Sequence, residues 1–324
     1  MITITIIIII ISYFYLFVCN FYKGFFMKNL LLLLLLFSCV FSMAQEAEVA
    51  TSEVPKEESA ISVLVRGDVV SQYWYNGIVC ENQGLIFQPA VYLNINLFQG
   101  NFLTSLDFNI GTFATFLDSP VSDVADGSTD HHYEQDLYVS LFFQLAKCLT
   151  FDVTYALYGS PNDSFNTYQQ LEFGFVFDDK ALTGAIFGIQ PSIRLIAELD
   201  GACDGQNEGV FLSLGINPNI DIYCFQNDED AINFSLPISA GFSIDNYYEF
   251  GAPDDNDLCW GYMSIGAKLN VPLAFIPARF GKWSGYVSGT MLVLDSQLAN
   301  YQGWAIDKEE NLHFFVSTGL AWNF

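Results

Sequence analysis

Hydrophobic and polar residues alternate over long stretches of this chain, and this period of two restricts its fold more than any other feature. In the last segment the apolar positions are Leu312, Phe314, Val316, Leu320, Trp322 and Phe324, with mostly polar residues between them. Successive side chains of a strand point to opposite faces, so such alternation predicts a β-strand with one apolar face. We expect twelve strands, at roughly 61–75, 84–97, 101–116, 133–145, 148–158, 166–177, 184–199, 209–223, 231–250, 259–271, 282–294 and 311–324.

The length and number of these segments favour a membrane barrel. Most exceed the 9–11 residues that a tilted strand needs to cross a bilayer, and an even number is typical of bacterial outer-membrane barrels. Only a closed barrel lets strands cross lipid without unpaired backbone groups at an edge. A soluble β-sandwich is the alternative, but its strands are usually shorter and its sheets bury their apolar faces against each other. We predict an all-β fold, a transmembrane antiparallel β-barrel of about twelve strands over residues 61–324.

Composition and charge fit the same class of protein. The chain is 52% hydrophobic and 16% aromatic, yet its formal net charge is −25. Disordered chains are poor in aromatic residues, so disorder is excluded. Nucleic-acid binding is excluded as well, because it needs a basic face. A lipid-facing surface would explain the high hydrophobic content, and acidic loops in water would explain the negative net charge.

The connections between the expected strands give an independent test. If the N-terminus is periplasmic, long external loops should alternate with short internal turns. The external set would be 76–83, 117–132, 159–165, 200–208, 251–258 and 295–310, and the internal set 98–100, 146–147, 178–183, 224–230 and 272–281. The external set carries sixteen acidic residues and one basic residue, Lys308. This asymmetry supports the predicted orientation.

The N-terminus predicts export. Residues 1–44 end in a secretory signal peptide, with Lys28 as its positive end, residues 30–40 as its apolar stretch and a small-x-small cleavage site at residues 42–44. We expect translation to start at Met27, so that residues 1–26 are an over-extended start; the alternative is a membrane helix over residues 2–18. Residues 45–60 would form an acidic flexible tail. The predicted location is the outer membrane of a Gram-negative bacterium.

The chain ends on alternating hydrophobic residues. Leu320, Trp322 and Phe324 resemble the C-terminal signal that the barrel-assembly machinery recognises in outer-membrane proteins. Aromatic residues at the expected strand ends suit girdles at the membrane interfaces, or alternatively loop packing. They are Tyr73, Trp74, Tyr75, Tyr247, Tyr248, Trp260 and Tyr262.

No pattern in the chain predicts catalysis, a cofactor or a metal site. The G-x-S-x-G, phosphate-loop and H-E-x-x-H motifs are absent. His131 and His132 fall in an acidic loop, where solvation or a metal role with Asp130 or Glu134 are the alternatives. His313 falls on the polar face of the last strand, which would line the lumen rather than face lipid. Five cysteines in the mature chain are an odd number, so they predict no disulfide framework.

Charged residues on the predicted inner faces are the candidate lumen-lining residues. The acidic ones are Asp68, Asp107, Asp152, Glu172, Glu198 and Asp221, and the basic ones are Arg66, Arg194 and Lys268; His313 completes the set. They would form either a salt-bridge network that fills a narrow barrel or an eyelet that selects solutes by fixed charges. Twelve strands lie between filled eight-stranded barrels and sixteen-stranded water channels, so both alternatives stay open.

Several short motifs resemble the TorF-like family of porins. They are Gly67-Asp68-Val69-Val70-Ser71-Gln72-Tyr73-Trp74-Tyr75-Asn76-Gly77, Gln88-Pro89-Ala90, residues 166–172, Gln190-Pro191-Ser192 and Leu199-Asp200-Gly201. Asn76 stands where that family usually has Arg before Gly77. The resemblance implies an outer-membrane barrel and adds little about chemistry.

The expected function is a channel that passes small solutes or ions with a cation preference, because acidic mouths concentrate cations. The alternative is a non-conducting structural or surface-interaction barrel whose acidic loops bind cations, lipopolysaccharide or an external ligand. The expected partners are outer-membrane lipid and lipopolysaccharide, the barrel-assembly machinery, and small solutes or ions.

Overall fold

The computed structural model describes residues 60–82, 84–118, 131–224, 231–249, 258–302 and 310–324. The strands are β1 (Ile61–Val70), β2 (Tyr73–Tyr75), β3 (Ile78–Glu81), β4 (Ile86–Gln99), β5 (Leu103–Leu117), β6 (His132–Leu145), β7 (Leu149–Gly159), β8 (Tyr168–Phe177), β9 (Phe187–Gly188), β10 (Ser192–Asp200), β11 (Val210–Ile216), β12 (Asn219–Cys224), β13 (Ala231–Ser235), β14 (Ile238–Asp245), β15 (Trp260–Pro272), β16 (Lys282–Leu294) and β17 (Leu312–Asn323). The helices are α3 (Asp179–Thr183), η2 (Ala278–Phe280) and α4 (Ser296–Tyr301). None of the described helices is long and apolar enough to cross a membrane.

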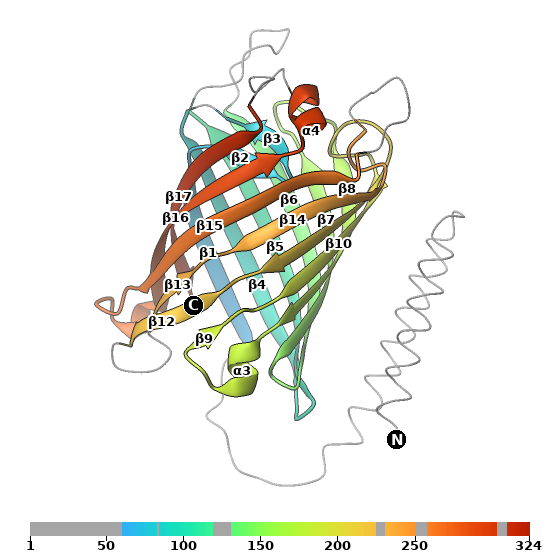
Figure 1. Cartoon of the computed structure of the whole chain (residues 1–324). Helices are drawn as coiled ribbons and strands as arrows, with labels where there is room; N and C mark the ends of the chain where they lie inside the picture. The colour runs from blue at the N-terminus through green and yellow to red at the C-terminus, as the bar shows by residue number, and fades with distance from the viewer. Residues whose placement is uncertain (1–59, 83, 119–130, 225–230, 250–257, 303–309) are drawn as a thin grey trace, which may run out of the picture. The chain divides into compact units, whose positions relative to one another are not determined.

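These residues form a closed antiparallel barrel of twelve strands (Figure 1). The ring runs β1-β4-β5-β6-β7-β8-β10-β11-β14-β15-β16-β17 and returns to β1. Closure depends on the pairing of β1 with β17, in which Leu64 lies opposite Asn323 and Val70 opposite Ser317. Phe324 extends this seam, because its backbone N–H and C=O both bond to Val63, at 2.9 and 2.8 Å. The prediction of a twelve-stranded barrel is confirmed.

The barrel has two distinct ends. We call the end that holds Ile61 and Phe324 the termini end; α3, β9 and η2 connect strands there (Figure 1). We call the opposite end the loop end; β2, β3 and α4 lie there (Figure 1). The connections at the loop end are the predicted external ones.

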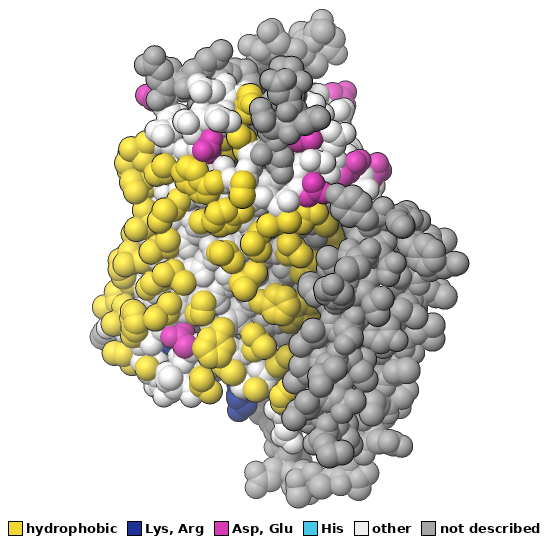
Figure 2. All heavy atoms as spheres, turned by 45° about the vertical axis from the view of Figure 1, so that its right-hand side comes forward, with side chains coloured by type: hydrophobic (Ala, Val, Ile, Leu, Met, Phe, Trp, Pro, Cys, Tyr) yellow, Lys and Arg dark blue, Asp and Glu magenta, His cyan; other side chains and the backbone are white. Residues whose placement is uncertain are grey.

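Apolar side chains cover the outer face. Figure 2 shows hydrophobic side chains across the middle of the visible face, with carboxylates concentrated nearer the loop end. The outward positions include some of the most exposed hydrophobic residues of the chain, such as Phe314, Val316 and Leu320. An apolar surface of this extent is typical of contact with lipid rather than water.

Prolines interrupt three of the expected strands. The segment expected at 209–223 divides into β11 and β12 at Pro218, and the segment expected at 231–250 divides into β13 and β14 at Pro237. Proline has no N–H for the ladder, and at these positions the strand is interrupted. The carbonyls of both prolines remain paired, with the N–H of Leu236 and of Gly266 at 2.8 Å. Pro191 likewise separates β9 from β10 within the segment expected at 184–199.

The first expected strand, 61–75, is too long. β1 ends at Val70, and residues 73–81 form a separate two-stranded sheet of β2 and β3. Its turn is Asn76-Gly77, with φ angles of 48° and 83°. Two positive φ angles in a two-residue turn match the type I′ hairpin, for which Asn-Gly is the preferred sequence. We call residues 73–81 the plug hairpin.

The plug hairpin packs inside the barrel near its loop end. Ile78 and Val79 are buried in one apolar cluster with Phe211, Tyr247 and Tyr248. The assignment of Tyr247 and Tyr248 to a membrane girdle is therefore wrong, since both side chains are fully buried. The same correction applies to Tyr262, which packs in that cluster. The alternative, loop packing, is correct for these tyrosines.

Some expectations fall on residues that lie outside the described part of the chain. They include the signal peptide, its cleavage site, the alternative membrane helix and the acidic tail. About half of the acidic residues expected in the external loops also lie outside it: Asp123, Asp126, Asp130, Asp254, Asp255, Asp257, Asp307 and Glu309.

Candidate functional site

An arginine–aspartate pair lines the inner face of β1. Arg66 donates from Nη2 and Nε to Oδ2 of Asp68, at 2.6 and 2.9 Å. The Asp68 side chain is only 3% exposed, whereas that of Arg66 is 41% exposed. The carboxylate is thus buried against the strands, and the guanidinium is the more exposed partner. A Cβ at Gly319 would collide with the Asp68 carboxylate, so the neighbouring strand β17 needs glycine at this position.

A second cation lies three strands away from Arg66 along the wall. Lys268 of β15 places its Nζ 4.2 Å from the centre of the Tyr286 ring on β16, a cation–π contact. Among the described residues, no carboxylate forms an ion pair with Lys268. The inner faces of β15 and β1 therefore each add one cation here, Lys268 and Arg66, and β1 also adds the carboxylate of Asp68.

The opposite wall holds a second arginine. Arg194 of β10 donates to Oε2 of Glu172 on β8 at 2.5 Å. The Glu172 side chain is 7% exposed and that of Arg194 is 49% exposed, so again the carboxylate lies in the wall and the guanidinium in the lumen. Asp152 of β7 is also buried, with its carboxylate over Gly174, where a Cβ would collide with it.

We call these six residues the lumen ring. It comprises Arg66, Asp68, Asp152, Glu172, Arg194 and Lys268. Three positive and three negative side chains make its formal charge zero, but the two arginines are far more exposed than the carboxylates that they pair with. A solute in the lumen would therefore meet hydrogen-bond donors first.

Hydrogen bonds join the plug hairpin to the wall next to the ring. The hydroxyl of Tyr75 donates to Oε1 of Gln170 at 2.6 Å and lies 3.0 Å from the hydroxyl of Tyr158. Tyr158 in turn donates to Oε1 of Glu172, the partner of Arg194, at 3.1 Å. One polar chain thus connects the hairpin with the lumen ring.

The loop end holds the hairpin from the other side. Gln302, which follows α4 and is fully buried, accepts from the N–H of Val79 at 2.6 Å and donates to the carbonyl of Gly77 at 2.9 Å. The Asn76 amide donates to the hydroxyl of Tyr247 at 2.7 Å, and the hydroxyl of Tyr248 donates to the Asn76 carbonyl at 2.5 Å. The plug hairpin is therefore fixed by polar contacts on several sides as well as by apolar packing.

Four predicted site residues lie apart from the ring. Asp107 accepts from Asn96 at 2.7 Å and Ser105 at 2.8 Å. His313 is buried, and its ring lies 4.6 Å from that of Trp74 in the plug hairpin.

Glu198 organises the loop that follows β10. It accepts from the backbone N–H of Cys203 at 2.7 Å and of Gly209 at 2.8 Å. Burial raises the pKa of the Cys203 thiol well above its usual range, and the nearby Glu198 carboxylate adds to the effect. Glu198 thus serves the loop rather than the open lumen.

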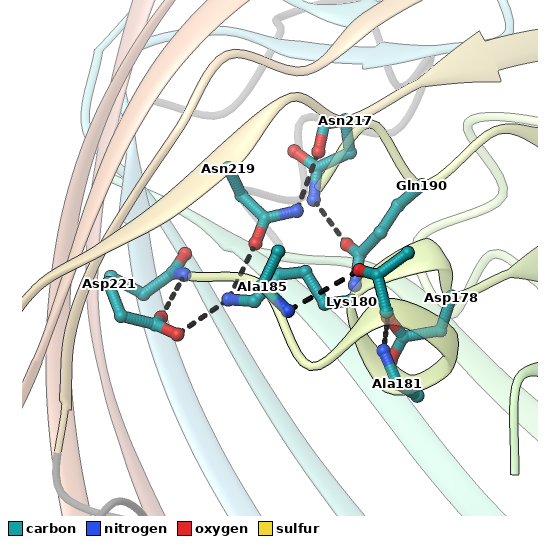
Figure 3. Close-up of polar contacts among 10 residues, drawn as sticks. Asp178, Lys180, Ala181, Ala185, Gln190, Asn217, Asn219 and Asp221 are labelled. Atoms are coloured by element: carbon teal, nitrogen blue, oxygen red, sulfur yellow. Dashed lines mark hydrogen bonds and ion pairs between the residues drawn. The ribbon is translucent and has the colours of Figure 1, made fainter. Parts of the chain in front are cut away.

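Asp221 belongs to a polar cluster at the termini end (Figure 3). Lys180 of α3 extends to Oδ2 of Asp221 at 2.6 Å and to Oδ1 of Asn219 at 3.1 Å. The Asp178 side chain caps α3 through the N–H of Ala181 at 3.0 Å. This cluster fastens the connection between β8 and β10 to β12.

The remaining candidates are a possible metal site, the two loop histidines and the C-terminal hydrophobic residues. The described residues contain no group of three or more His, Cys, Asp and Glu side chains that could hold a metal ion. Nδ1 of His131 lies 2.7 Å from the carbonyl of Leu117, and His132 stacks on Phe116. On β17, Leu320 faces outward, and Nε1 of Trp322 donates to the carbonyl of Phe280 at 2.7 Å.

Four residues that hold the plug hairpin were not predicted in this role: Tyr75, Tyr158, Gln170 and Gln302. Asn76-Gly77 was the available signal, since this dipeptide marks a two-residue hairpin. Gln302 gave no signal, because nothing in its local sequence shows that its amide meets a hairpin more than two hundred residues away.

No model of a known protein family matches the chain, and no curated protein matches its sequence. Solved structures with a similar fold include an outer-membrane channel from Pseudomonas putida F1, with 12% identity and a TM-score of 0.46, covering 86% of this chain and 100% of that one. The β-domain of the Bordetella autotransporter BrkA shows 11% identity and a TM-score of 0.42, over 82% and 99% of the two chains. The NanC porin shows 10% identity and a TM-score of 0.42, over 80% and 98%.

Proposed function

We propose that this protein is an outer-membrane channel for small solutes. The observation that carries the proposal is the exposure of Arg66 and Arg194, because both side chains lie on inner faces of the barrel and yet are 41% and 49% exposed. Exposed guanidinium groups on inner faces would meet water and solutes in the lumen, as a channel requires. Figure 2 adds the apolar outer surface that such a channel needs in lipid.

The proposed channel prefers cations. Sixteen acidic residues and one basic residue fall in the connections that the sequence predicts to be external. Fixed negative charge at a mouth concentrates cations and repels anions over about 8 Å at physiological ionic strength. Single-channel recording across a salt gradient tests this preference through the sign of the reversal potential. Neutralising the exposed residues Asp163 and Glu208 should weaken it, and a reversal potential that favours anions would reject it.

A specific observation supports the second candidate, a non-conducting barrel. The plug hairpin fills part of the loop end with Ile78, Val79 and their buried tyrosine neighbours. Conductance of the protein purified from outer membranes separates the candidates. Reproducible current steps support the channel. The absence of current from both the wild type and Gln302→Met, a variant that should loosen the plug hairpin, supports the non-conducting barrel. Ligands of the acidic loops would then be the next to test.

Biogenesis and membership of the TorF-like family belong to the same proposal. Residues 1–44 would direct export, and the C-terminal Leu320, Trp322 and Phe324 would be recognised by the barrel-assembly machinery. Lipid and lipopolysaccharide would surround the outer face. N-terminal sequencing of the exported protein tests the cleavage, and a start far upstream of Gln45 would reject it.

A further inference from the structure

We propose that the lumen ring recognises the carboxylate of small zwitterionic solutes of the amino-acid type, through Arg66, Arg194 and Lys268. This inference rests on the proposed channel function and names the solute class of that channel.

The three cations are spread over half of the circumference, from β1 through β15 to β10, rather than sharing one patch. In the ring of strands, β1 and β10 lie six positions apart in either direction, so Arg66 and Arg194 project from opposite walls. Lys268 is on β15, three strands from each of them. A solute that crosses this level must pass between cations from three sides.

The three cations also lie at similar heights. Through the pairings of β1 with β17, β17 with β16 and β16 with β15, Arg66 is in register with Pro272 of β15. Through the pairings of β10 with β11, β11 with β14 and β14 with β15, Arg194 is in register with Tyr262 of the same strand. Lys268 lies between Tyr262 and Pro272 on that strand. With about 3.3 Å per residue, about 4.8 Å between strands and a tilt near 45°, these registers place the three Cα atoms within about 6 Å along the barrel axis.

Each cation has donors available. Arg66 uses Nη2 and Nε for Asp68, and Arg194 uses Nη1 for Glu172, so their remaining guanidinium N–H groups can bind a solute. The Lys268 ammonium contacts the Tyr286 ring but forms no ion pair among the described residues. Charge-assisted bonds from such groups to a carboxylate are the strong ones, and arginine can bind it with two parallel bonds.

The charge balance selects among solutes that carry a carboxylate. The ring is neutral overall, so it does not attract anions over a distance. The acidic loop end repels solutes of net negative charge. A solute that carries both a carboxylate and an ammonium group is neutral overall and satisfies both conditions, and its ammonium can interact with the negative field of Asp152 and Glu172 behind Arg194.

Permeation into proteoliposomes tests the inference. Swelling rates are measured with serine, a zwitterion, and with glycerol, a neutral solute of similar size. The main variant is Lys268→Met, because its loss leaves no paired carboxylate behind. A second variant, Arg66→Met with Asp68→Asn, removes an ion pair as a unit. Arg279→Met is the control, since Arg279 lies in η2 at the termini end, away from the ring.

The expected result is a serine-to-glycerol ratio that falls at least threefold in both ring variants and stays unchanged in the control. An unchanged ratio in both ring variants, with glycerol still permeating, would overturn the solute assignment and leave the channel intact. If neither solute permeates the wild type or Gln302→Met, in which the plug hairpin should be loosened, the channel itself is rejected. The assignment of its solute class is then rejected as well. Slower migration of the unheated protein on a denaturing gel confirms that each variant is folded.

Discussion

Replacing Gln302 by methionine should release the plug hairpin while leaving the barrel closed. The Gln302 amide forms two hydrogen bonds to the hairpin backbone, with the N–H of Val79 and the carbonyl of Gly77. Gln302 is not part of a barrel strand, and methionine has a similar length and volume. The substitution therefore removes the two hydrogen bonds without opening a large cavity.

The size of the effect follows from burial. Gln302 is fully buried and Val79 is 2% exposed, so the substitution leaves two backbone groups without partners in a dry environment. Each such group costs about 1–3 kcal/mol. The docked state of the hairpin should lose about 2–6 kcal/mol relative to the released state, and even the lower value shifts that equilibrium by about 30-fold.

Single-channel recording measures the consequence. We expect Gln302→Met to spend a larger fraction of time in an open state than the wild type, with an unchanged maximal conductance. Gln297→Met is the matched control, because Gln297 lies in α4, the helix that Gln302 follows, and is exposed. Equal open fractions in Gln302→Met and the wild type, with both proteins folded, would show that the plug hairpin does not control the path.

Three further predictions concern the barrel, the cysteines and α3. Gly319→Ala should destabilise the barrel by about 1–3 kcal/mol in denaturant titrations, because its Cβ would collide with neighbouring inner-face side chains, whereas Gly289→Ala, which points into open space, should stay within about 0.5 kcal/mol of wild type. Iodoacetamide at pH 8 should alkylate the exposed Cys259 and spare Cys203 until unfolding, because burial raises the pKa of the Cys203 thiol; equal rates by mass spectrometry would contradict this. Two backbone N–H donors after β9 lower the pKa of Asp179, so its stabilising contribution is present above the unfolded pKa and is lost as pH falls through the folded value. Hydrogen exchange of those amides should show this loss of protection in the wild type, and the same pH response in Asp179→Asn would refute the assignment.

Alternation made the barrel predictable from the sequence. In a closed sheet each strand has one face in lipid and one in the lumen, so polarity switches at every residue and locates both the strands and their faces. The alternation predicted β7 almost to the residue, since its expected range of 148–158 compares with Leu149–Gly159. It failed where alternation continued past a change of direction: Tyr73 and Tyr75 keep the period of β1, but the chain has already turned into the lumen.

The candidate site was predictable only in part, for the same reason. The alternation of inward and outward positions along a strand assigned Arg66, Asp68 and Lys268 to inner faces, because their outward neighbours are apolar. The alternation cannot show which inner residues lie at the same height along the barrel axis, since this height depends on the stagger of all twelve strands. It also cannot show which loops fold inward, because a contact such as that of Gln302 with Val79 depends on the closed barrel bringing distant loops together.

The burial of the carboxylates gives the lumen ring its chemical character. An arginine without a counter-ion would add net charge to the lumen, and a buried carboxylate without a cation would be costly in the wall. An arginine–carboxylate pair avoids both the net charge and the unpaired buried carboxylate. Because the arginine is the exposed member of the pair, it is the group that a solute meets. The loops and the ring would then act on different properties of a solute, the loops on its net charge and the ring on its carboxylate. We therefore expect lysine, which satisfies both conditions, to permeate faster than glutamate, which the acidic loop end repels before it reaches the ring.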